Sequence, residues 1–255
     1  MIEEQFSRTS LLLGADVMQR LRDTRVIVFG VGGVGSWCAE ALVRSGVGHL
    51  TMVDADTVAA SNINRQVLAT TATVGCVKVE VMRRRLLDIA PSADIRAVYS
   101  FYDDATAPDF ALDDFDYVID AIDSLRSKIL LIRRAAASRA TLFSSMGAAR
   151  KTDPRRVDVA EFWKVHGCPL AACLRKAMRQ GERPARKFMC VFSDELVPNA
   201  GRPSAADNVA RVHCADGERD TGKVHANGAL VTVTATFGLT LASLVLDDVT
   251  RKAGK

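Results

Sequence analysis

The sequence contains no Cys-x-x-Cys pair, although it has six cysteines. Such pairs supply the ligands of zinc ribbons, so their absence argues against a zinc cassette of that kind. The scattered spacing also gives no disulfide framework, and a reducing, cytoplasmic location is therefore expected. The six are Cys38, Cys76, Cys168, Cys173, Cys190 and Cys214.

Several other features are missing. Residues 1–10 include Glu3 and Glu4 and have no apolar core, so no secretory signal is predicted. No internal repeat or low-complexity tract is present. The histidines of the second half have no metal-ligand spacing, and each is more typical of a surface position than of a general base. They are His166, His213 and His225.

Charge is low overall but unevenly distributed. The net charge is +4, yet residues 150–187 contain 11 basic and 4 acidic residues, a local charge of +7. The rest of the chain is therefore net negative. A block of this kind is either a solvated face or a face that binds a polyanion, and the sequence leaves both readings open.

The strongest motif is a glycine-rich turn. Gly30, Gly32, Gly33 and Gly35 follow the apolar run 26–29 and precede a segment with helical character. In a Gly-x-Gly-x-x-Gly turn the first glycine permits the tight bend, and the second lets backbone N–H groups approach a phosphate. The third lets the helix and strand pack closely, and the helix dipole then faces the anion. The motif predicts a nucleotide site.

An acidic residue follows the next apolar run. Asp54 ends the run 49–53, at about the 20-residue spacing at which an acid takes a ribose hydroxyl in such folds. Because strand, turn, helix and acid are all present, a glycine turn without a ligand is the less favoured interpretation.

Apolar runs and helical patterns alternate along the chain. This alternation predicts an α/β fold with a Rossmann-like, doubly wound, mostly parallel sheet and a mixed C-terminal extension. Strands are expected at 26–29, 49–53, 95–101, 117–120, 141–145, 157–163 and 188–192. Helices are expected at 10–21, 36–43, 74–89, 125–139, 169–180 and 228–246.

Two segments of the second half are unusual. Residues 198–222 are polar and aperiodic, which predicts a mobile loop. Residues 228–246 carry no charge and are just long enough to cross a bilayer. Their threonines and glycines, and the lack of a second such segment, favour a buried helix and no membrane insertion.

Charged and polar side chains near the glycine turn indicate the type of reaction. Asp56, Asn62 and Arg65 lie in the loop after Asp54, and Lys78 follows it. An arginine and a lysine that converge on a triphosphate suit nucleotidyl transfer, in which catalysis is mostly positioning and charge stabilisation.

A further acid, Asp123, follows the strand at 117–120, at the sheet edge where ligands bind in open α/β folds. Carboxylate and phosphate oxygens together suit Mg²⁺. A nicotinamide-dependent oxidoreductase would use the glycines and Asp54 but would leave Arg65, Lys78 and Asp123 without a role.

At these residues the sequence resembles the ubiquitin-activating-enzyme-like adenylyltransferases, which include the sulfur-carrier activators of thiamin and molybdopterin synthesis. The shared pattern comprises GVGGVG at 30–35, Asp54, SNINRQ at 61–66, Lys78 and DAID at 120–123. The resemblance implies an ATP site in which Asp54 binds ribose, Asn62, Arg65 and Lys78 bind phosphates, and Asp123 holds Mg²⁺. The glycines and Asp56 complete this site. It further implies a homodimer in which Arg8 reaches the γ-phosphate in the neighbouring subunit.

Within this superfamily the sequence is most similar to the tRNA threonylcarbamoyladenosine dehydratases. The similarity covers nearly the whole chain and includes GVGSW at 33–37, YVIDAIDS at 117–124, PLAA at 169–172, CVFS at 190–193 and VTATFG at 233–238. It implies that ATP adenylates the threonyl carboxylate of a modified adenosine in tRNA. A nitrogen of the same side chain then closes the ring, which gains a large effective molarity. The basic segment 150–187 would contact the tRNA backbone.

The resemblance also implies a domain organisation. Residues 1–255 form one adenylating domain, with a nucleotide-binding half at 1–147 and a substrate and dimer half at 148–255.

Alternatives stay open. The runner-up is adenylation of the C-terminal glycine of a ubiquitin-like sulfur carrier, and a sulfur-relay protein is a possible partner. A non-catalytic partner subunit is a further alternative. A cysteine of the related enzymes corresponds to a place near Lys223, nine positions from Cys214. Cys190 is expected in the core, whereas the roles of Cys168 and Cys173 stay ambiguous.

Overall fold

The chain is organised around one mixed sheet. The computed structural model describes residues 3–201 and 227–254, and this part contains a seven-stranded sheet. Its strands are β1 Arg25–Phe29, β2 His49–Val53, β3 Asp94–Val98, β4 Tyr117–Asp120, β5 Thr141–Ser145, β6 Val157–Glu161 and β7 Met189–Ser193.

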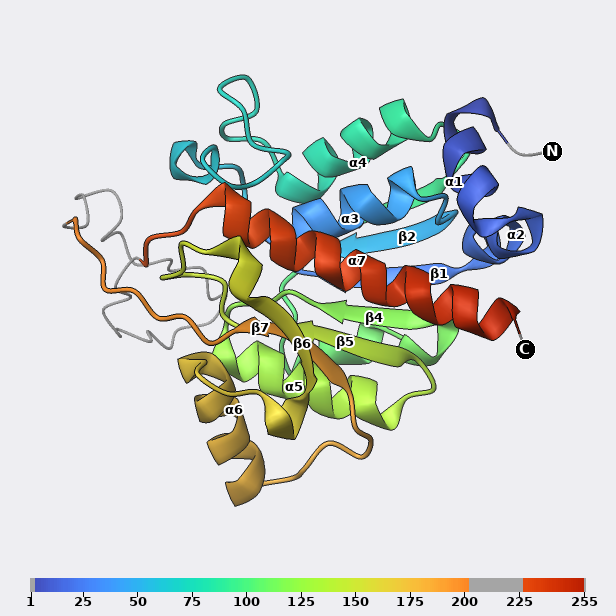
Figure 1. The fold of residues 1–255 in the computed structure, drawn as a ribbon. Coiled ribbons are helices and arrows are strands. Elements are labelled where there is room, and N and C mark those ends of the chain that lie inside the picture. Colours follow the sequence, from blue (N-terminus) through green and yellow to red (C-terminus); the bar gives the residue numbers. More distant parts are fainter. Residues whose placement is uncertain (1–2, 202–226, 255) are drawn as a thin grey trace.

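The strand order is β3-β2-β1-β4-β5-β7-β6 (Figure 1). All neighbouring strands run parallel except the last pair, in which β6 runs antiparallel to β7. The predicted doubly wound, mostly parallel sheet with a mixed C-terminal extension is confirmed.

Helices cover both faces of the sheet. The α-helices are α1 Ser7–Leu13, α2 Ala15–Asp23, α3 Gly35–Arg44, α4 Lys78–Ile89, α5 Leu125–Ala137, α6 Pro169–Gln180 and α7 Val231–Ala253. Short 3-10 helices lie at Glu4–Phe6, Ala60–Asn62, Ala107–Asp109, Leu112–Asp114, Pro154–Arg156 and Phe162–Lys164. Figure 1 shows α3, α4 and α7 on one face and α5 and α6 on the other.

The burial of both faces explains the strand sequences. Residues 26–29 of β1 are all fully buried, because one core cluster covers each side of the sheet. A strand buried on both faces is apolar throughout and does not alternate. The edge strand β6 is half exposed and accordingly contains Asp158 and Glu161.

Three predicted helices differ from the structure, and the one expected at 228–246 spans Val231–Ala253. The helix expected at 10–21 is two helices, α1 and α2, because Gly14 adopts a φ of +82° and ends the first one. The helix expected at 74–89 begins only at Lys78. Gly75 has a φ of +87°, and its N–H donates to Val58 O, so this stretch forms a turn against the preceding loop.

The long helix α7 packs against the nucleotide-binding half. Its buried residues include Val233, Phe237 and Leu241, which join the same core cluster as α2 and α3. A Cβ at Gly238 would lie 2.4 Å from Val34 O, so glycine permits the close approach of α7 to α3. By length and composition α7 is the one described helix that is apolar enough to span a membrane. Its packing confirms the predicted buried helix.

The parallel strands place the predicted site residues at one edge. The five parallel strands β1, β2, β4, β5 and β7 all have their carboxyl ends on the same side of the sheet. We call this side the ligand edge, and the loops that leave it carry the glycine turn, Asp54 and Asp123. α1 and α2 lie at the opposite edge, where β1 begins (Figure 1).

Candidate nucleotide and substrate site

The glycines of the turn have different structural roles. Gly30 has a φ of +88°, and a Cβ there would lie 2.6 Å from Ala121 O. A Cβ at Gly35, the first residue of α3, would lie 1.8 Å from Gly30 O. At Gly32 the nearest atom to such a Cβ is Gln66 Nε2, at 3.8 Å. The fold therefore requires Gly30 and Gly35, whereas Gly32 leaves room for a ligand to approach the backbone.

Asp54 joins the end of β2 to this turn. Its Oδ2 accepts a 2.7 Å hydrogen bond from Val31 N, and its Oδ1 accepts one of 2.8 Å from Asp56 N. Burial raises the pKa of Asp54, although the charge of Lys78 and the two backbone donors oppose this shift. The carboxylate thus lies beside the nucleotide turn. Its predicted contact with ribose stays a prediction.

Lys78 and Asp56 form a close ion pair. Lys78 begins α4, is 2% exposed, and places Nζ 2.7 Å from Asp56 Oδ2. Its backbone N–H also donates to Asp56 O at 3.0 Å. The pair holds the ammonium group among the loops at the ligand edge of the sheet, as a phosphate-binding lysine requires.

The loop that contains Asn62 and Arg65 is held by internal contacts. Arg65 Nη1 donates to Ser61 O and to Asn64 Oδ1, both at 2.8 Å. The indole N–H of Trp37, on α3, donates to Arg65 O at 3.0 Å. Asn62 is buried and accepts from Ala59 N. A Cβ at Gly33 would lie 3.2 Å from Arg65 Cγ, so the structure brings Arg65 to the glycine turn.

One buried acceptor in this loop lacks a partner. Gln66 is 4% exposed, and within the described part of the chain its Oε1 accepts no hydrogen bond. Its amide lies next to Gly32. Gln66 belongs to the shared SNINRQ pattern but was not predicted as a site residue. A buried acceptor without a donor beside an open glycine turn fits a polar ligand there.

Asp123 follows a buried ion pair that fixes its loop. Asp120 and Lys128 are both fully buried, and Lys128 Nζ lies 2.9 Å from Asp120 Oδ2. Asp120 Oδ1 accepts from Ile122 N, and Lys128 Nζ donates to Ile122 O at 3.0 Å. Both backbone polar groups of Ile122 are therefore held immediately before the exposed Asp123.

Ser144, on β5, donates a further 2.7 Å hydrogen bond to Asp120 Oδ2. Sequence analysis missed this network. The sequence feature that could have indicated this network is Lys128, a charged residue on the face of α5 that buries Leu131 and Ile132.

The residues near Asp123 are consistent with magnesium that phosphate also ligates. Within the described ranges no cluster of three or more His, Cys, Asp or Glu side chains has metal-ligand geometry. Mg²⁺ is commonly bound by one or two carboxylates together with substrate phosphates and water. One exposed carboxylate at the strand edge next to a phosphate-binding turn fits that donor set.

Arg8 lies away from its own glycine turn. It is exposed on α1, at the edge of the sheet where β1 begins. The structure therefore does not bring Arg8 together with Lys78 or Asp123 of the same chain. This position agrees with the expectation that Arg8 serves a neighbouring subunit, which stays a prediction.

The cysteines divide by burial. Cys38, Cys168 and Cys190 are buried, and Cys76 and Cys173 are exposed. Cys190 is fully buried in the core cluster beside α5 and α6, which confirms its predicted position, and this burial raises the pKa of its thiol. Cys214, His213, His225, Lys223 and residues 202–222 of the expected mobile loop lie outside the described residues.

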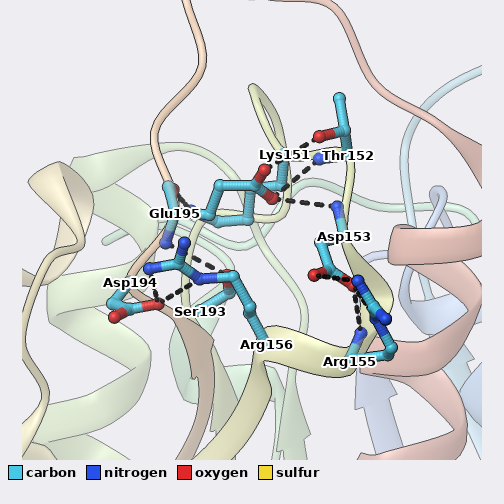
Figure 2. Close-up of polar contacts among 8 residues, drawn as sticks. All are labelled: Lys151, Thr152, Asp153, Arg155, Arg156, Ser193, Asp194 and Glu195. Carbon is cyan, nitrogen blue, oxygen red and sulfur yellow. Dashed lines mark hydrogen bonds and ion pairs between the residues drawn. The ribbon is translucent and has the colours of Figure 1, made fainter.

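A polar cluster lies just beyond the carboxyl ends of β5 and β7 (Figure 2). Lys151 is buried and donates to Glu195 O, and its burial lowers the pKa of the ammonium group. The Glu195 carboxylate accepts from Thr152 N and Thr152 Oγ1, both at 2.8 Å, and from Asp153 N at 3.0 Å. The cluster joins the segment before β6 to the segment after β7. Nothing in the sequence pattern indicated these pairings.

The sequence matches the ThiF family over residues 6–254. The chain belongs to the ThiF family. Two curated relatives are tRNA threonylcarbamoyladenosine dehydratases. The one from Bacillus subtilis is 44% identical over 75% of each chain, and the one from Haemophilus influenzae is 34% identical over 98% of this chain and 95% of the relative.

A solved structure of another ThiF-type enzyme has the same fold. The Escherichia coli tRNA N6-threonylcarbamoyladenosine dehydratase, in complex with ATP, superposes with a TM-score of 0.84 at 32% identity. The match covers 100% of this chain and 98% of that one. The resemblance to this branch is thereby confirmed across the whole length of the chain.

Proposed function

We propose that this ThiF family chain is an ATP-dependent tRNA threonylcarbamoyladenosine dehydratase. The observation that carries the proposal is the match, over the full chain, to an enzyme of that name whose structure contains ATP. The glycine turn, the Lys78–Asp56 pair and the Gln66 acceptor, which has no hydrogen-bond partner among the described residues, support a phosphate-binding site at the ligand edge of the sheet.

The chemistry explains why ATP is needed. A carboxylate does not readily expel hydroxide, so its oxygen first attacks the α-phosphorus of ATP, and pyrophosphate leaves. An atom of the same threonylcarbamoyl side chain then attacks the activated carbonyl carbon, and AMP leaves with the carboxylate oxygen. The modified adenosine loses one water overall. Because the second step is intramolecular, positioning contributes a large part of the rate.

The chain's own residues have separable roles in this scheme. Backbone N–H groups of the turn at Gly32 and Gly33 bind phosphate oxygens, together with the dipole of α3. Asn62, Arg65 and Lys78 stabilise the negative charge that develops on the phosphates. Asp54 binds the ribose, and Asp56 orients Lys78. Arg8 of a second copy reaches the γ-phosphate.

Magnesium completes the assignment. We place it on Asp123, whose loop is fixed by Asp120 and Lys128. Bound there, the ion neutralises phosphate charge as pyrophosphate leaves.

The remaining expectations concern assembly and location. The chain works as a homodimer, with a nucleotide-binding half at 1–147 and a substrate and dimer half at 148–255. A cytoplasmic location suits a tRNA substrate. A sulfur-relay protein is a further candidate partner.

Mass spectrometry of nucleosides from threonylcarbamoylated tRNA tests the proposal directly. Incubation with this protein, ATP and Mg²⁺ is expected to remove one water from the modified adenosine, and only when ATP is present. No mass change, with pyrophosphate exchange on a sulfur-carrier protein, would instead support the runner-up activity. Neither signal, despite ATP binding, would support the non-catalytic alternative.

A further inference from the structure

The basic segment 150–187 is not one surface. Its first part is committed to internal contacts in the cluster of Figure 2. Arg155 pairs with Asp153 at 2.9 Å, and Arg156 pairs with Asp194 at 2.8 Å. Lys151 donates to Glu195 O, and Arg150 donates to Val197 O. Arg150, Lys151 and Arg156 thus join the segment before β6 to the segment after β7, and the two ion pairs neutralise the charges of Arg155 and Arg156.

The second part of the segment is different. Two of its arginines also donate to backbone carbonyls, Arg175 to Val165 O and Arg186 to Ala136 O. Five others are exposed and, among the described residues, have neither an ion pair nor a side-chain hydrogen bond. The five are Lys164, Lys176, Arg179, Arg183 and Lys187. Lys187 lies beside Asp248 and Arg251 of α7. We call Lys176 and Arg179 on α6, together with Arg183 just after it, the α6 cationic surface. Glu182 is the acid that lies among them.

An aromatic side chain orders part of this surface. The guanidinium carbons of Arg179 and Arg183 each lie 5.7 Å from the centre of the Trp163 ring. The ring in turn packs edge-on against Phe162, with the centroids 5.0 Å apart. Stacking on an aromatic face leaves the N–H groups of a guanidinium free to donate, and it limits the conformations that the side chain must give up on binding.

The start of α6 adjoins the loop that follows β5. α6 begins at Pro169, directly after Cys168, whose Sγ lies 3.9 Å from the Cβ position of Gly147 in the loop that follows β5. Twelve helical residues extend over about 18 Å. The helix therefore leads away from the ligand edge of the sheet, and its exposed cations, Lys176 and Arg179, lie in its second half.

We infer that the α6 cationic surface binds the sugar–phosphate backbone of the tRNA whose modified adenosine occupies the site. The inference rests on the proposed function. Two exposed arginines elsewhere in the fold, Arg96 and Arg139, lie within ion-pair distance of Asp94 and Asp113, and these pairs leave little net charge. Arg179 and Arg183 differ because both lie over one aromatic ring, where two cations are held together. Arginine forks match phosphate oxygens without reading base sequence, which suits a helix far from the reacting base.

The test is the salt dependence of tRNA binding. The affinity of threonylcarbamoylated tRNA is measured by fluorescence anisotropy at several salt concentrations, for the wild type and for Arg179→Gln/Arg183→Gln. Log affinity falls as log salt rises, and the magnitude of this negative slope is expected to decrease by about 1.5 for two lost phosphate contacts. At about 0.1 M salt the affinity is expected to fall on the order of 10-fold or more.

The matched control is Arg20→Gln/Arg84→Gln. It removes the same charge from two exposed arginines on α2 and α4, on the other face of the sheet. Its slope is expected to equal that of the wild type. Thermal unfolding and ATP affinity of both variants report that fold and nucleotide site are intact.

The outcomes are distinct. An unchanged slope of log affinity against log salt in the α6 variant, while the wild type binds tRNA, would overturn the inference. It would instead favour an acidic protein as the partner of this surface. Equal losses in both variants would also overturn it, because they would indicate a general charge effect. A wild-type protein without salt-sensitive tRNA binding would count against the proposed function itself.

Discussion

At the scale of single residues, two glycines of the same turn have opposite roles. Gly35→Ala places a methyl group 1.8 Å from Gly30 O, so α3 and the turn must move apart. Overpacking of this kind costs about 1–3 kcal/mol or more. Gly32→Ala meets no atom closer than 3.8 Å, so its folding stability is expected to match the wild type.

The two variants are separated by two measurements. Gly32→Ala should lower ATP affinity, on the order of 10-fold, because its methyl group lies where phosphate approaches the backbone. Chemical denaturation should detect the Gly35→Ala defect and miss the Gly32→Ala one. Wild-type ATP affinity in folded Gly32→Ala would contradict the placement of the nucleotide.

Asp123 gives a second prediction at this scale. Asp123→Ala should abolish ATP-dependent turnover and leave thermal unfolding unchanged, because the side chain is exposed. ATP affinity measured with and without Mg²⁺ should lose its dependence on the ion. Asp109→Ala, at another exposed acid, serves as the control. Near-normal turnover in a folded Asp123→Ala protein would remove this residue from the site.

At the scale of elements, the buried pair between β4 and α5 should dominate local stability. Lys128→Met leaves the Asp120 carboxylate without its cation, and losing one partner of a buried pair costs about 3–5 kcal/mol. The double variant Lys128→Met/Asp120→Asn should recover part of this loss, because no charge stays buried. Urea denaturation of the wild type, Lys128→Met, Asp120→Asn and the double variant completes a mutant cycle. Additive losses would show that the two side chains act separately.

The contact between α3 and α4 should make stability depend on pH. Glu40, on α3, accepts from Arg85 Nε at 2.5 Å and from Arg44 Nε at 2.9 Å. Burial opposes ionisation of this carboxyl, but the two arginines outweigh it and lower the pKa of Glu40 below its usual 4.5. A carboxyl whose pKa is lower in the folded than in the unfolded protein stabilises the fold at pH values above its unfolded-state pKa. This stabilisation is lost as the pH falls through the folded-state pKa.

Glu40→Gln should therefore be less stable than the wild type at pH 7. The difference should narrow as the pH falls below 4.5, the usual value for this carboxyl. Urea midpoints across a pH series check this. A difference that stays constant with pH would mean that the ion pairs contribute nothing measurable.

The same scale shows what the sequence could and could not predict. Strands such as β1 and β4 were predicted to within a residue, because burial on both faces leaves a continuous apolar run. Helix boundaries at Gly14 and Gly75 were missed, since a positive φ depends on what the following segment must reach. In the site, the turn and the acids follow local patterns. The Asp120–Lys128 pair and the cluster around Lys151 join residues far apart in the chain, and no local pattern specifies them.

At the scale of the whole molecule, we expect the second copy of the proposed homodimer to bind near α1. Leu11 and Leu12 are 80% and 83% exposed on the helix that carries Arg8. If Arg8 serves the neighbouring subunit, Arg8→Ala and Asp123→Ala are each inactive alone. Mixing them lets a heterodimer combine Asp123 of one chain with Arg8 of the other. Random exchange then leaves about one site in four intact.

Recovery of that fraction of turnover after mixing and exchange would confirm both the dimer and the shared site. An equal mixture of Lys78→Ala and Asp123→Ala is the control. Both residues belong to the same chain's site, so this mixture should stay inactive. Absence of recovery in the first mixture, with exchange of chains verified by mass spectrometry, would contradict the assignment of Arg8 to the neighbouring subunit's site.

The position of α7 has a consequence for synthesis. This helix follows every strand in the chain, yet it forms one wall of the core that α2 and α3 share. During translation the glycine turn and its strands emerge long before that wall exists. Apolar surface on α3 then stays open to water or to chaperones until Val231 and the residues after it have left the ribosome. A nascent chain stalled before that point would carry all the nucleotide-contacting motifs and still be prone to aggregate.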